Sequence, residues 1–134
     1  MSAFVPPAVV QLVDDDADVR RALTRLLTSA GLDVRSFASA EAFLLSAELE
    51  DAACLVLDLR MPGASGLDLQ AELAARGFEL PVLFLSGHGD VRSSVSAMKS
   101  GAVDFLQKPV DEAEFLAAVG RAREMGVLQR AASH

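Results

Sequence analysis

Tryptophan and tyrosine are both absent from this chain of 134 residues, and cysteine occurs once, as Cys54. A single cysteine excludes an internal disulfide, and its place in an apolar run favours a small buried residue over a reactive thiol. No apolar run approaches the length that spans a membrane, and the N-terminus lacks the basic start and apolar core of a secretion signal. By default, these absences favour a cytoplasmic protein without a membrane contact.

Positive charge is also scarce, because 12 Lys and Arg residues stand against 19 Asp and Glu and give a net charge of −7. The basic residues are scattered, whereas binding to nucleic acid needs them clustered against phosphates. The missing tryptophan and tyrosine also remove aromatic platforms on which bases stack. We therefore expect no direct nucleic-acid binding by this chain.

The chain does contain an alternation of short apolar runs with stretches of helical periodicity. Hydrophobic residues make up 51%, and the length suits one domain, 1–134, with a core at about 8–125. Strands are expected at 9–13, 32–37, 54–57, 81–85 and 103–106, with a helix after each. The signals for helix starts are Ser39, Asp90 and Asp111, and those for helix ends are Gly31 and Gly101.

Five strands alternating with five helices predict an α/β fold, in which a parallel sheet carries helices on both faces. Right-handed crossovers leave few topologies for such a sheet. Ligands of these folds bind beyond the carboxyl ends of the strands, where the strand order reverses. The residues that carry chemistry should therefore follow the strands.

Polar residues do follow four of the five predicted strands. They are Asp14-Asp15-Asp16 after the first, Asp58 after the third, Ser86 after the fourth and Lys108-Pro109 after the fifth. Each alone has an ordinary interpretation, such as an acidic turn, a helix cap at Asp16 or a surface lysine. Because the carboxyl ends of parallel strands lie along one edge of a sheet, we expect the four groups to converge.

Such a cluster has a defined chemistry. Two carboxylates about 4 Å apart repel by roughly 4 kcal/mol at an effective dielectric of about 20, so Asp14, Asp15 and Asp58 together call for a cation. Carboxylate oxygens without a nearby histidine or thiolate suit Mg²⁺ or Mn²⁺. With its charge neutralised, one carboxylate can attack a phosphoryl group, while a lysine and a hydroxyl hold the phosphoryl oxygens.

The motifs in this order resemble the response-regulator receiver domain, over roughly residues 9–124. The resemblance rests on four segments: Leu12-Val13-Asp14-Asp15, Val56-Leu57-Asp58-Leu59-Arg60-Met61-Pro62, Leu85-Ser86-Gly87 and Phe105-Leu106-Gln107-Lys108-Pro109. Residues 86–91 and 97–105 are most similar to the FixJ-type subfamily, whose members usually carry a helix-turn-helix DNA-binding domain after the receiver.

The resemblance implies a flavodoxin-like (βα)5 fold with strand order 2-1-3-4-5 and an Mg²⁺-dependent switch. It implies that Asp58 accepts a phosphoryl group from a histidine kinase. It further implies that Asp15, Asp58 and the backbone carbonyl of Arg60 ligate Mg²⁺, and that Asp14 reaches the ion through water.

The remaining implied roles concern the phosphoryl group and the switch. Lys108 bonds the phosphoryl group, and the bond between Lys108 and Pro109 is cis. Ser86 moves toward the phosphate and Phe105 turns inward, which reshapes the face of the fourth helix and fifth strand. The resemblance thus implies phosphorylation-driven homodimerisation through that face, and output through transcription.

Two of these residues have plain alternatives. An ordinary core aromatic is the alternative for Phe105, and an exposed loop histidine without a role is the alternative for His88, which could also tune water access to the phosphate. On the fourth helix, Val91, Val95 and Met98 form the expected docking surface, and the alternative is that they face the core.

Three other functions are less consistent with the residues. A phosphatase of the haloacid-dehalogenase type needs a second aspartate two positions after its nucleophile, where this chain has Arg60, so we do not expect a turnover enzyme. A flavodoxin-like carrier needs a phosphate-binding loop after the first strand, where three aspartates would repel phosphate. A pseudo-receiver would not need the intact Asp58 and Lys108.

The fifth helix is expected to end before Gln129, and the chain shortly after it. No DNA-binding helices are expected within these residues, so an output domain would lie outside them. A fragment of a larger regulator is the favoured interpretation, and a stand-alone receiver or phosphorelay intermediate is the alternative.

Overall fold

A five-stranded parallel sheet forms the centre of the computed structural model, which describes residues 5–46, 48–87 and 91–133. The strands are β1 (Val9–Val13), β2 (Asp33–Phe37), β3 (Ala52–Asp58), β4 (Val82–Ser86) and β5 (Asp104–Gln107). Their spatial order is β2-β1-β3-β4-β5, and each neighbouring pair is parallel. The predicted fold class and strand order are therefore confirmed.

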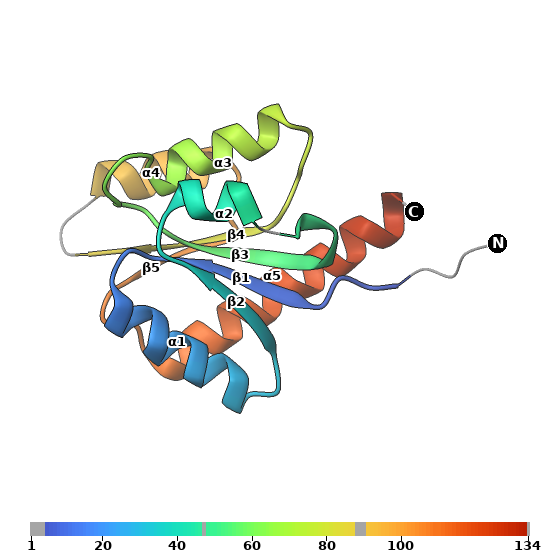
Figure 1. Cartoon of the computed structure of the whole chain (residues 1–134), viewed down its shortest axis with the longest axis horizontal. Helices are drawn as coiled ribbons and strands as arrows, with labels where there is room; N and C mark the ends of the chain where they lie inside the picture. The colour runs from blue at the N-terminus through green and yellow to red at the C-terminus, as the bar shows by residue number, and fades with distance from the viewer. Residues whose placement is uncertain (1–4, 47, 88–90, 134) are drawn as a thin grey trace.

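Helices cover both faces of the sheet (Figure 1). They are α1 (Ala17–Ser29), α2 (Ala40–Ser46), α3 (Gly66–Ala75), α4 (Val91–Lys99) and α5 (Glu112–Ser133), with a 3-10 turn, η1 (Leu49–Asp51), before β3. One apolar cluster joins α1 and α5 to the sheet through Leu27 and Phe115, and a second joins α2, α3 and α4 to the other face through Phe43 and Leu69. β3 is buried along its whole length because it lies between these two layers.

Side-chain caps fix where several helices begin. The Asp16 carboxylate accepts hydrogen bonds from the amides two and three residues on, and the Ser39 hydroxyl accepts one from the amide three residues on. Asp111 caps α5 in the same way. The predicted caps at Asp16, Ser39 and Asp111 are confirmed, whereas Asp90 lies outside the described residues.

Cys54 is buried in β3. Burial raises the pKa of its thiol to about 12, and the nearby Arg123 only partly offsets that effect. The thiol therefore stays protonated and unreactive, as its place in an apolar run indicates. No helix among the described residues is both long and apolar enough to cross a membrane.

The fifth helix is longer than the sequence pattern predicts. α5 runs for 22 residues to Ser133, so an end before Gln129 is wrong. The extension is held because the Arg130 guanidinium donates to the backbone oxygens of Leu49 and Glu50 in η1, at 2.9 and 2.8 Å. Contacts with the distant turn, rather than local helix signals, thus determine its length.

Gly126 is required where α5 crosses the backbone of β3. A Cβ at this position would overlap the backbone oxygen of Ala53, whereas a Cβ at Gly120, in the same helix, would meet open space. We expect Gly126→Ala to lower the free energy of unfolding by about 2 kcal/mol or more, because the helix must move off the strand. Gly120→Ala should instead raise it by about 0.5–1 kcal/mol through helix propensity. Urea unfolding measures the free energy of unfolding of both variants. A change of that free energy in the same direction in both would contradict this assignment.

Candidate functional site

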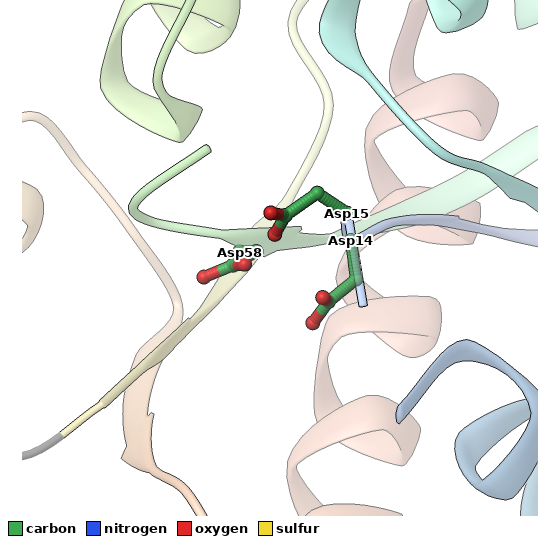
Figure 2. Close-up of side chains that lie close together, drawn as sticks. All are labelled: Asp14, Asp15 and Asp58. Carbon is green, nitrogen blue, oxygen red and sulfur yellow. The ribbon is translucent and has the colours of Figure 1, made fainter. Parts of the chain in front are cut away.

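Three carboxylates meet at the carboxyl ends of β1 and β3. Asp14 and Asp15 follow β1, Asp58 ends β3, and an oxygen from each lies within 4.8 Å of the others. Figure 2 shows the three side chains gathered at this edge of the sheet. Asp14 and Asp58 are buried, and Asp15 is exposed. The expected convergence of these strand ends is therefore present in the structure.

A single ammonium group bridges the two buried carboxylates. The Lys108 Nζ lies 2.8 Å from Asp14 Oδ2 and 3.3 Å from Asp58 Oδ2. Burial alone would lower the pKa of Lys108, but the carboxylates of Asp14 and Asp58 outweigh it, and the pKa is raised. Lys108 therefore stays charged inside the cluster. The peptide bond between Lys108 and Pro109 is cis.

One lysine does not neutralise the cluster. Burial first, and then the charge of Asp14, raise the pKa of the Asp58 carboxyl from 3.8 to about 7. A hydrogen bond with Asp15 also raises this pKa, whereas Lys108 and the backbone N–H of Arg60 lower it. Near pH 7 the site therefore retains part of a proton, which indicates a deficit of positive charge.

The donor set fits a hard divalent cation. Carboxylate oxygens are the ligands that Mg²⁺ takes in proteins, usually with several waters kept. The exposed side chain of Asp15 leaves room for such waters, and a cation would relieve the repulsion that raises the pKa of Asp58.

The segment after Asp58 is held by backbone contacts. The Leu59 amide donates to the backbone oxygen of Leu85 at 2.8 Å, and the Gly66 amide donates to the oxygen of Leu59 at 3.1 Å. A Cβ at Gly66 would lie 2.5 Å from the backbone oxygen of Asp58, so only glycine lets α3 begin this close to the strand end. The sequence alone did not indicate this contact. Its only signal was a glycine just before a helical pattern.

Ser86 ends β4, the strand next to β3, and Phe105 lies on β5, the strand beyond it. Ser86 is buried, and its hydroxyl donates to the backbone oxygen of Gly87 at 3.0 Å, while its own backbone oxygen accepts from the Lys108 amide at 2.6 Å. Phe105 is half-buried and packs at the margin of the α2–α3–α4 cluster, so it is not a fully buried core aromatic. His88 lies outside the described residues.

The described part of α4 presents apolar side chains to the surface. Val95 is 49% exposed and Met98 is 47% exposed. The alternative that these two residues face the core is therefore wrong. The side chain of Val91 lies outside the described part of the structure.

Comparison with known proteins gives consistent matches. Residues 10–120 match the family model described as the response regulator receiver domain. Nodulation protein W of Bradyrhizobium diazoefficiens is 50% identical over 117 residues, which are 87% of this chain and 52% of that protein. The transcriptional regulatory protein FixJ of Azorhizobium caulinodans is 50% identical over 121 residues, with 87% of this chain and 57% of that protein covered.

The fold has a similarly close counterpart. The crystal structure of FixJ-N shares 42% sequence identity with a TM-score of 0.80, and the match covers 90% of this chain and 96% of that one. The chain spans about half the length of the curated relatives that it matches. Since the family match spans most of the chain and includes Asp14, Asp15, Asp58 and Lys108, the chain belongs to the response regulator receiver domain family.

Proposed function

We propose that Asp58 accepts a phosphoryl group from the phosphohistidine of a sensor kinase. One carboxylate oxygen of Asp58 attacks phosphorus, the bond from phosphorus to the imidazole nitrogen breaks, and its electron pair returns to the imidazole. The observation that carries this proposal is the position of Asp58 at the end of β3, with Asp14 and Asp15 within 4.8 Å and the Lys108 ammonium at 3.3 Å.

We further propose that the cluster binds Mg²⁺ through Asp15, Asp58 and the backbone carbonyl of Arg60, with Asp14 reached through water. Bound Mg²⁺ would supply positive charge against the incoming phosphoryl oxygens. The Lys108 ammonium is the second positive group within reach, and the Ser86 hydroxyl is a neutral donor. These two side chains would hold phosphoryl oxygens by charge-assisted and ordinary hydrogen bonds.

A groove next to Lys108 supports the approach of a kinase helix. Its volume is about 420 Å³, and it lies between α1 and the segment from β5 to α5. Apolar side chains line most of it, among them Val19, Leu26 and Val110. An amphipathic helix seated there would bring a side chain near Lys108 and Asp58. Since such a kinase donates phosphate inside the cell, we also propose a cytoplasmic location.

Phosphoryl uptake tests the proposal directly. The wild-type chain is expected to gain the mass of one phosphoryl group from acetyl phosphate when Mg²⁺ is present, and to gain none in EDTA. Intact-protein mass spectrometry counts the groups. A chain that stays unmodified with Mg²⁺, or that is modified equally in EDTA, would contradict the proposed function.

Asp15→Ala is expected to abolish measurable Mg²⁺ binding, because the site loses a ligand that neither Asp14 nor Lys108 replaces. Isothermal titration calorimetry of wild type, Asp15→Ala and Asp33→Ala measures this. Asp33 is an exposed aspartate at the start of β2, so its variant removes the same charge at a distance and should bind as wild type. Equal binding by all three proteins would defeat the ligand assignment.

We propose that phosphorylation controls association of two copies through α4 and β5. Val95 and Met98 supply exposed apolar surface there. The phosphoryl group adds roughly −1.5 to −2 charges. If the Ser86 hydroxyl donates a hydrogen bond to the phosphoryl group only in the active state, that contact shifts the equilibrium between the inactive and active states.

Beryllofluoride, an analogue of the phosphoryl group, is expected to raise the sedimentation coefficient of the wild-type chain, and Ser86→Ala should weaken that shift. Met98→Asp should prevent it, because a charge would be buried in the interface. An activated wild-type chain that stays monomeric at high micromolar concentration would contradict dimerisation.

Transcription control through a DNA-binding domain outside this chain is the output that the relatives favour, since FixJ is named a transcriptional regulatory protein. A stand-alone receiver or phosphorelay intermediate is the alternative. In either case we propose a phosphorylated switch rather than a turnover enzyme. Arg60 stands two positions after Asp58, where an aspartyl phosphatase needs its acid and base.

A further inference from the structure

A groove between α1 and β2 gathers positive charge, and the proposed phosphorylation chemistry does not use it. Its volume is about 480 Å³, and the residues that line it are Ala17, Arg20, Arg21, Thr24, Arg25 and Ser36. α1 packs beside β2, one of the two edge strands of the sheet (Figure 1). The described residues of the lining include three arginines and no carboxylate, in a chain whose net charge is −7.

The three guanidinium groups differ in how they are held. Arg20 Nη1 donates to the backbone oxygen of Asp14 at 2.6 Å, which ties one end of the groove to the phosphorylation site. Arg21 pairs with Asp18. Arg25 has no ion-pair partner in the part of the chain that the structure describes, and it lies four residues from Arg21, where two like charges on a helix repel. An anion between these arginines would remove that repulsion.

The groove also contains hydroxyl groups. The Thr24 hydroxyl oxygen is buried, and it has no hydrogen-bond partner among the described residues. Ser36 contributes a second hydroxyl from β2. A buried hydroxyl without a partner is unfavourable, so an acceptor oxygen in the groove would satisfy it. Guanidinium groups beside neutral hydroxyls bind carboxylates by charge-assisted hydrogen bonds.

We propose that this groove binds an acidic segment of a partner polypeptide. From Ala17 to Arg25 the α1 backbone rises about 12 Å, which about four residues of extended chain can match. Aromatic side chains are missing from the described lining, so nucleotide bases would find no stacking platform. Two carboxylates on one side of the segment would engage Arg21 and Arg25, and a backbone or side-chain oxygen would accept from Thr24.

An NMR titration of the ¹⁵N-labelled chain with an octa-glutamate peptide tests this inference. We expect chemical-shift changes in α1 from Arg20 to Arg25 and in β2 around Ser36. Arg21→Ala and Arg25→Ala should each weaken binding by about five-fold or more, because each removes a charge-assisted contact. Arg92→Ala, an exposed arginine of α4, is the matched control and should bind as wild type. Raising the salt concentration should weaken binding in all of them.

Three outcomes would overturn the inference. They are the absence of shifts in α1 and β2, equal affinity in the Arg25→Ala chain, and an octa-glutamine peptide that binds as well as octa-glutamate. Inorganic pyrophosphate and a single-stranded oligonucleotide are titrated in parallel. Tighter binding of either at the same residues would reassign the groove to small phosphates or to nucleic acid. Since phosphoryl uptake is measured separately, these results do not depend on the proposed function.

Discussion

Phosphoryl uptake from acetyl phosphate is expected to be at least about 100-fold lower in Asp58→Asn than in the wild type. The amide that replaces the carboxylate is a poor nucleophile, and no other carboxylate takes its place in the described structure. Asp14 is buried and paired with Lys108 at 2.8 Å, and Asp15 is exposed to water beyond the strand end. Intact-protein mass spectrometry after incubation with Mg²⁺ measures the uptake.

Asp33→Asn is the matched control, because it makes the same exchange at an exposed position at the start of β2. It should be phosphorylated as wild type. The dispersion of the amide NMR spectrum reports whether Asp58→Asn is folded. Full labelling of a folded Asp58→Asn chain would place the acceptor elsewhere, and peptide mapping of the modified chain would then identify it.

The site could be largely predicted from the sequence because strand ends define it. In a parallel sheet, residues that directly follow the strands meet at one edge whatever the details of packing. Asp14, Asp58, Ser86 and Lys108 therefore needed only correct strands, and β1, β3 and β4 are short, mostly apolar runs that the pattern identifies. The strand limits differ from the predicted ones, since β3 begins at Ala52 and ends at Asp58 rather than covering only 54–57.

What the sequence did not predict depends on contacts outside the regular hydrogen bonding of helices and strands, some of them between distant segments. The length of α5 depends on Arg130 reaching η1, about 80 residues earlier in the chain. The close approach of Gly66 to the Asp58 carbonyl and the bond from Arg20 to the Asp14 carbonyl are also tertiary contacts. Neither leaves a periodicity or a spacing that a pattern could detect.

In metal-free buffer, Asp58→Asn is expected to stabilise the fold at neutral pH and to lose that advantage in acid. The pKa of Asp58 is raised by burial and by Asp14 to about 7 in the folded chain, above its ordinary value of 3.8. Between these two pH values the folded state holds a proton that the unfolded state has released. The stability of the wild type therefore falls as the pH rises from about 4 to about 7, and Asp58→Asn escapes that loss.

The size of this effect follows from the same proton. At about 1.4 kcal/mol for each pKa unit, the upper bound is about 4 kcal/mol, and movement of Lys108 toward the ionised carboxylate lowers the expected difference to about 2 kcal/mol. Urea unfolding of wild type, Asp58→Asn and Asp33→Asn in EDTA from pH 4 to pH 8 measures it. Added Mg²⁺ should then raise the free energy of unfolding of the wild type at pH 8 and leave that of Asp58→Asn unchanged, because only the wild type keeps the full set of carboxylates. If the free energies of unfolding of wild type and Asp58→Asn differed by a constant amount across the pH range, ionisation of the buried Asp58 would not destabilise the fold.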